Sequence, residues 1–173
     1  MALERYQESL LEYLISALFA RVGEPGTLTG EGKPAGFQIK KSLGGGTCEA
    51  SHSLEYALPS GRKLPHVSDI LISLPKGKAV AVELQWATDL SDQLNARAYD
   101  ALHLKQALGT RLTAFLIYLR AGQGGLSTEQ AREICYPFDQ FIALEHQDPQ
   151  NPAIWVPVLD RIEAEIALRQ LAT

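Results

Sequence analysis

Residues 64–86 read LPHVSDILISLPKGKAVAVELQW, which is two apolar segments of strand length joined by Pro75-Lys76-Gly77. A three-residue loop with glycine in the last place is a favoured hairpin connection. The segment 64–74 is therefore predicted to fold back, antiparallel, on the segment 78–86. This hairpin sets the register from which the rest of the chain is interpreted.

Counted outward from the loop, Asp69 falls opposite Glu83 to within one residue. Side chains alternate along a strand, so Glu83 and Gln85 share one face of the hairpin. The opposite face takes the apolar residues Val82, Leu84 and Trp86. Two carboxylates and an amide are thus expected to converge on one patch.

Neighbouring carboxylates repel, and a hard cation such as Mg²⁺ is the simplest way to neutralise them. Mg²⁺ prefers a few carboxylates together with waters and phosphate oxygens. On spacing alone, an alternative stays open in which Asp69 ends in a bend and Glu83 pairs with an arginine. Acidic residues are common in hairpins and carry no function of their own.

The same reading extends to both sides of the hairpin. Apolar spacing and turn residues predict helices over 4–22, 88–108, 127–135 and 157–172, and further strands near 37–42, 48–58, 112–119 and 138–144. The core order within this set is helix, three strands in a meander, helix, strand, which predicts an α/β fold with a central mixed sheet flanked by helices, plus a C-terminal helix. We expect a single domain over 1–173, with a core over about 4–120 and additions over about 121–173.

An apolar stripe at helical spacing marks the last helix, at Leu159, Ile162, Ile166 and Leu171. The stripe predicts either a lid on the core or the surface of a homodimer.

The formal net charge of −4 argues against a protein that coats nucleic acid by bulk electrostatics. Basic residues nevertheless outnumber acidic ones between residues 30 and 80, which is compatible with a local basic rim. The two cysteines form no CxxC pair, so neither a zinc knuckle nor a disulfide framework is indicated. No signal peptide or membrane span is expected, and we expect a cytoplasmic protein.

Two runs around the loop carry a resemblance: His66-Val67-Ser68-Asp69-Ile70-Leu71-Ile72, and then Ala79-Val80-Ala81-Val82-Glu83-Leu84-Gln85. Together they resemble the D…(D/E)xK signature of the PD-(D/E)XK, or restriction-endonuclease-like, nuclease superfamily. The Glu83-Leu84-Gln85 run, followed by Leu90-Ser91, Arg97 and Tyr99, is similar to the E-x-Q variant found in competence CoiA-like proteins. Both resemblances cover roughly residues 4–120.

The resemblance implies roles for individual residues. Asp69 and Glu83 would be metal ligands, and Gln85 would stand where most members have lysine. Glutamine can neither act as a base nor carry charge, but its amide can orient a water or donate to a phosphate oxygen. A glutamate of the first helix often completes such a site, which points to Glu12, with Glu8 one turn earlier as the reserve. A solvated helix face is the alternative for Glu12.

Candidate nucleic-acid contacts lie on either side of this site. Gln93 and Arg97, one helical turn apart, could point back over Glu83 and Gln85 toward a phosphate, while Arg97 could instead pair with an aspartate (Asp89, Asp92 or Asp100). A basic rim is expected from Lys40, Lys41, Arg62 and Lys63, although lysines on strand edges also serve simply to block aggregation.

The sequence leaves two functional hypotheses. In the first, the chain is an Mg²⁺- or Mn²⁺-dependent endo- or exodeoxyribonuclease of restriction, repair or recombination type, with Asp69, Glu83 and Gln85 as catalytic residues and DNA as its partner. In the second, Gln85 has weakened catalysis, and the same fold is a module that binds nucleic acid or a protein.

Overall fold

The structure is a computed structural model that describes residues 13–14, 17, 38–43, 46–51, 56–57, 60–64, 69–87, 91–120, 124–145 and 151–171. For β1 (Gln38–Leu43), β2 (Gly46–Ser51) and β3 (Tyr56–Ala57) it describes the backbone. Of the predicted first helix, Tyr13, Leu14 and Ala17 are described, and all three are helical.

The fold is α/β, built on a mixed six-stranded sheet in the order β1-β2-β5-β6-β7-β8. Its further strands are β5 (Ile70–Leu74), β6 (Lys78–Trp86), β7 (Leu112–Arg120) and β8 (Gln140–Glu145). From β1 to β6 neighbouring strands are antiparallel, whereas β6, β7 and β8 run parallel. The predicted mixed sheet flanked by helices is confirmed.

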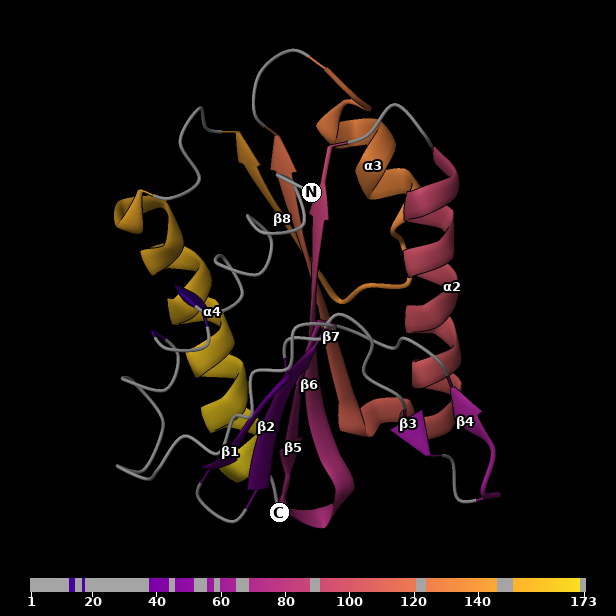
Figure 1. Ribbon diagram of the computed structural model, residues 1–173, viewed down its shortest axis with the longest axis vertical. Coiled ribbons are helices and arrows are strands. Elements are labelled where there is room, and N and C mark those ends of the chain that lie inside the picture. The colour runs from indigo at the N-terminus through magenta and orange to yellow at the C-terminus, as the bar shows by residue number, and fades with distance from the viewer. Residues whose placement is uncertain are drawn as a thin grey trace.

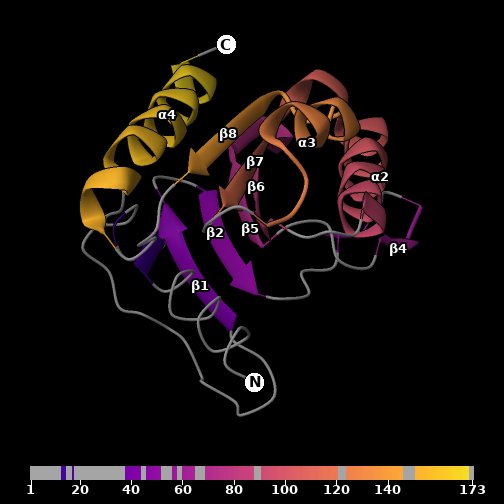
Figure 2. The same ribbon diagram turned by 90° about the horizontal axis from the view of Figure 1, so that it is seen from above.

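Helices cover both faces of the sheet (Figure 1, Figure 2). On one face α4 (Pro152–Leu171) packs through Trp155, Val158, Leu159, Ile162 and Ile166, and Leu14 joins the same cluster. On the other face lie α2 (Ser91–Leu108) and α3 (Thr128–Ile134). The α4 stripe therefore covers the core, which is the first of its two predicted roles. No helix of the described segments is long and apolar enough to cross a membrane.

The β5–β6 hairpin has the predicted three-residue loop, since Leu74 pairs with Lys78 and Pro75–Gly77 (η1) lies between them. Lys76 and Gly77 both adopt left-handed backbone, with φ of 63° and 69°. β7 is buried along its length apart from Arg120, and β8 forms one edge of the sheet.

Two predicted strands are interrupted. The segment 48–58 divides into β2 and β3, and the segment 64–74 divides into β4 (Lys63–Leu64) and β5. β3 and β4 pair with each other as a separate two-stranded sheet.

The last helix begins at Pro152, and the prediction of a start at Pro157 was wrong. The side chain of Asn151 accepts a hydrogen bond from the Ala153 N–H at 3.0 Å, which caps the helix, and Pro152 takes the first position that suits proline. Pro157 stands inside the helix and costs it one backbone hydrogen bond.

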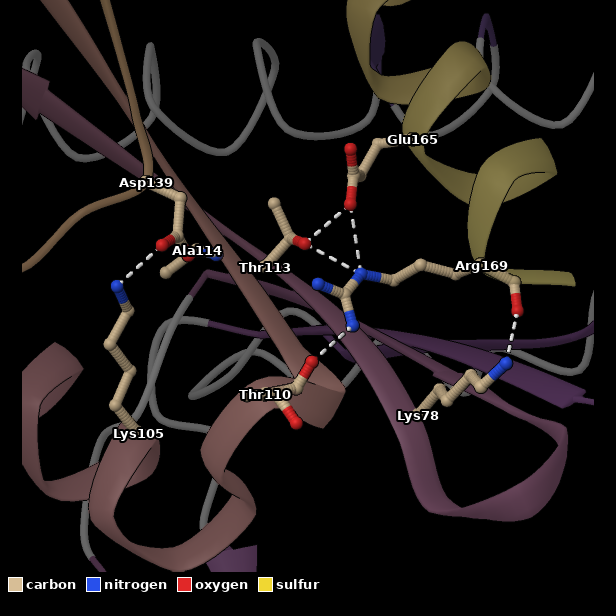
Figure 3. A network of polar contacts seen from close by, with 8 residues as sticks. All are labelled: Lys78, Lys105, Thr110, Thr113, Ala114, Asp139, Glu165 and Arg169. Carbon is tan, nitrogen blue, oxygen red and sulfur yellow. Dashed lines mark hydrogen bonds and ion pairs between the residues drawn. The ribbon is translucent and has the colours of Figure 1, made fainter. Parts of the chain in front are cut away.

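A polar network joins the C-terminal part of α4 to the start of β7 (Figure 3). The hydroxyl of the buried Thr113 donates to Glu165 Oε1 and accepts from Arg169 Nε at 2.6 Å. Arg169 Nε also lies 2.9 Å from Glu165 Oε1, and Arg169 Nη1 donates to the Thr110 carbonyl at 3.0 Å. These bonds give the buried hydroxyl its hydrogen-bond partners and bring two opposite charges together at the edge of the core.

We expect Thr113→Val to lower the free energy of unfolding by about 1–2 kcal/mol, because it removes a hydroxyl that is hydrogen-bonded to two partly buried side chains at the edge of the core. Urea denaturation measures the change. Thr110→Val is the matched control, since Thr110 contributes only its backbone carbonyl to the network. An effect of Thr113→Val no larger than that of Thr110→Val would contradict this account.

Candidate active site

The site begins where the β5–β6 ladder ends, at the pair Ile70 and Val82. One residue earlier, the Asp69 N–H donates to the Val82 carbonyl at 3.1 Å, and Asp69 Oδ2 accepts the Leu84 N–H at 2.8 Å. The carboxylate thus takes the place of a strand carbonyl. This contact holds Asp69 beside Glu83, as the hairpin register predicted.

Glu83 and Gln85 lie on the α2 face of the sheet, and Val82, Leu84 and Trp86 pack on the α4 face, as alternation predicted. Asp69, Glu83 and Gln85 are only 6%, 3% and 6% exposed. The polar patch is therefore a buried one, enclosed between the sheet and α2.

Burial raises the pKa of Glu83 well above its ordinary value of 4.5, and the neighbouring charge of Asp69 raises it further. The Arg97 guanidinium and a backbone hydrogen bond at Asp69 act in the opposite direction, while Asp100 adds to the rise. The net effect is an acidic pair that favours an added positive charge.

Arg97 supplies one positive charge from α2. Its Nε lies 2.9 Å from Glu83 Oε1 and 3.5 Å from Gln85 Oε1. Arg97 thus points back over the site and forms an ion pair with Glu83, while Asp69 lies in a bend, so both features of the non-functional alternative that the spacing left open are present. Of the three aspartates that the sequence suggested as partners, Asp100 is close enough for the guanidinium to lower its pKa, although burial raises that pKa overall.

Gln85 is held by its neighbours on both sides of the amide. Its Nε2 donates to the Trp86 carbonyl at 2.9 Å and to Gln93 Oε1 at 3.2 Å, so both amide hydrogens are used. Its oxygen faces Arg97. In this arrangement Gln85 positions Arg97 and Gln93, and a phosphate or water would have to displace one of these bonds to receive a hydrogen from it.

Cys135, which sequence reasoning did not connect to the site, follows α3 and is buried beside this polar patch. Burial raises the pKa of its thiol to about 12, and the charge of Glu83 contributes to the rise. The thiol is therefore neutral and is a poor nucleophile. Its position depends on the packing of α3 against α2, for which the sequence contains no local signal.

The structure describes the remaining predicted site residues to different extents. Glu12 and its reserve Glu8 lie outside the described residues, and Lys40 and Lys41 are described only as backbone of β1. Arg62 and Lys63 are exposed at the small β3–β4 sheet, which lies beside the lower part of α2 in Figure 1.

Asp69 and Glu83 offer two buried carboxylates, and burial disfavours the charge of Glu83. Carboxylates are ligands that Mg²⁺ and Mn²⁺ accept together with waters and phosphate oxygens. Among the described residues, no group of three His, Cys, Asp or Glu side chains is placed to hold a metal. A third protein carboxylate would have to come from elsewhere in the chain, as was predicted for Glu12.

The chain was compared with protein-family models and with curated proteins, and it matches none of either.

We expect the stability of the metal-free protein to fall as pH rises above 4.5, because a raised carboxyl pKa makes the folded state hold a proton that the unfolded state has released. Glu83→Gln mimics the protonated side chain and should remove this decline. The difference in free energy of unfolding between the variant and the wild type should therefore grow from about pH 4 to pH 8, measured by urea denaturation. Glu133→Gln, at an exposed position of α3, is the control. Parallel pH profiles for wild type and Glu83→Gln would refute the buried, coupled acidic pair.

Proposed function

We propose that this chain is a metal-dependent nuclease that hydrolyses phosphodiester bonds in DNA and acts in the cytoplasm. The observation that carries the proposal is the buried Asp69–Glu83 pair with Arg97 over it. Two carboxylates in such a position are costly unless a cation joins them, and a nearby guanidinium suits a phosphate substrate.

Each residue then has a separate task. Asp69 and Glu83 would hold Mg²⁺ or Mn²⁺, with Glu12 as auxiliary ligand. The bound ion would polarise the phosphodiester and lower the pKa of a water. Arg97 would bind a phosphate oxygen through its planar fork. Gln85 and Gln93 would orient Arg97 through the bonds described above, so the role proposed for Gln85 is positioning.

Arg97 would also have two partners in turn, the Glu83 carboxyl group and the substrate phosphate. Without a metal its guanidinium is engaged by the Glu83 carboxyl group, at an Nε–Oε1 distance of 2.9 Å. A divalent ion on the two carboxylates would occupy that carboxyl group and leave the guanidinium available to the substrate. Arg97 of α2 would thereby supply a positive charge at a site where Gln85 stands in place of a lysine.

A second candidate function rests on the same ion pair. Arg97 already satisfies Glu83, and Gln85 has no charge, so the fold could persist without a metal. The protein would then be a module that binds nucleic acid or a protein partner and cuts nothing. Cleavage assays separate the two candidates.

For the nuclease, we expect Asp69→Ala and Glu83→Ala each to reduce cleavage of a panel of single-stranded, duplex and branched DNA by about a hundredfold or more, because a bound metal stabilises the transition state by several kcal/mol. Cutting should require Mg²⁺ or Mn²⁺ and stop with EDTA. Glu133→Ala should cut like the wild type. Intact DNA in every wild-type reaction, together with measurable DNA binding, would reject the nuclease in favour of the binding module.

A further inference from the structure

Asp100 lies on α2 one helical turn after Arg97, at a spacing that places both side chains on the same side of the helix. The residue is partly buried, whereas Asp92, in the first turn of the same helix, is exposed. These two aspartates are the acidic residues of α2. Asp100 is therefore the one whose position brings it toward the site.

The charges around Asp100 connect it to the site. Burial raises the pKa of its carboxyl group, and the positive charge of Arg97 opposes this rise, followed by that of His103. Burial and the charge of Asp69 raise the pKa of Glu83, and the charge of Asp100 adds to that rise. Asp100 thus lies within electrostatic reach of both members of the Glu83–Arg97 ion pair.

Arg97 lies between the solvent and the buried carboxylate. Its side chain is 28% exposed, whereas the Glu83 side chain that it contacts at 2.9 Å is 4% exposed. The same Nε is 3.5 Å from Gln85 Oε1. A guanidinium has five N–H donors, and these two contacts are both made at Nε, so the group can hold a further anion as well.

Two carboxylates are thus available to one guanidinium. Glu83 is the one that Arg97 contacts in the structure, through a charge-assisted bond. A cation bound to Glu83, or the loss of its charge, removes the attraction that favours this contact. Asp100 then becomes the preferred anion, because a pair spaced i, i+3 on a helix forms through a change of side-chain rotamer alone.

We propose that Asp100 is a positioning residue for Arg97, which holds the guanidinium at the edge of the site when the Glu83 carboxylate is occupied and leaves other N–H donors for a substrate phosphate. This role explains why an acidic residue stands beside an arginine proposed to bind phosphate. The inference rests on the proposed function for the phosphate, whereas the exchange of Arg97 between two carboxylates can be tested without metal or DNA.

The test is a double-mutant cycle on stability, in which Glu83→Gln represents a Glu83 whose charge a cation has neutralised. The guanidinium should then pair with Asp100. Asp100→Asn should therefore lower the equilibrium constant for folding about threefold more in the Glu83→Gln background than in the wild type. Urea denaturation without divalent metal measures the constants. Adding Arg97→Gln to every member of the cycle should abolish the difference, and Asp100→Glu, which keeps the charge, should not produce it.

Asp92→Asn is the matched control, because it removes the same charge from an exposed position of the same helix. It should affect the wild type and the Glu83→Gln variant equally. In a protein that cuts DNA, Asp100→Asn should also lower kcat/KM about tenfold through misplacement of Arg97, although the loss of a negative charge by itself favours DNA binding.

Equal effects of Asp100→Asn in the two backgrounds would overturn the inference. An extra effect that persists without Arg97 would do the same, because Asp100 would then act through His103 or through its charge alone. If DNA is cut but the cycle shows no coupling, the nuclease stands and the role of Asp100 fails. If the coupling is present but nothing is cut, the exchange of Arg97 stands and the nuclease fails.

Discussion

Asp69 and Glu83 share one buried face of the β5–β6 hairpin. Burying two carboxylates side by side costs free energy, and this cost explains which groups surround them. Asp69 is stabilised by the Leu84 N–H, and Glu83 by the Arg97 guanidinium. The first contact ties the Asp69 carboxylate to the backbone of β6, so the same carboxylate belongs to the hairpin and to the site. It adds to the negative charge that a cation would neutralise.

The rest of the fold holds that pair in a fixed frame. Parallel pairing of β6 with β7 requires α2 to cross the sheet, and this crossing brings Gln93 and Arg97 over Glu83 and Gln85. On the opposite face, α4 supplies the apolar cover, and its last turns are tied to β7 through Thr113. The residues of α4 thus belong to the main apolar cluster.

The local rules of sequence predicted the hairpin well. Its loop length, the alternation of faces and the proximity of Asp69 to Glu83 follow from period-two spacing and one turn. Contacts between distant elements were beyond those rules. The ion pair of Arg97 with Glu83 depends on the angle at which α2 crosses β6, and the closeness of Cys135 depends on how α3 packs against α2. The start of α4 was misplaced because Pro157 is a stronger breaker signal than the Asn151 cap, although the helix tolerates it.

Metal binding by the acidic pair is the central claim, and calorimetric titration of the protein with Mn²⁺ tests it most directly. The wild type should bind one ion per chain, and Asp69→Asn with Glu83→Gln, which keeps the shape of both side chains and removes their charge, should abolish that binding while Glu133→Gln preserves it. A double variant that binds Mn²⁺ as the wild type does, or a wild type that binds none, would contradict the account.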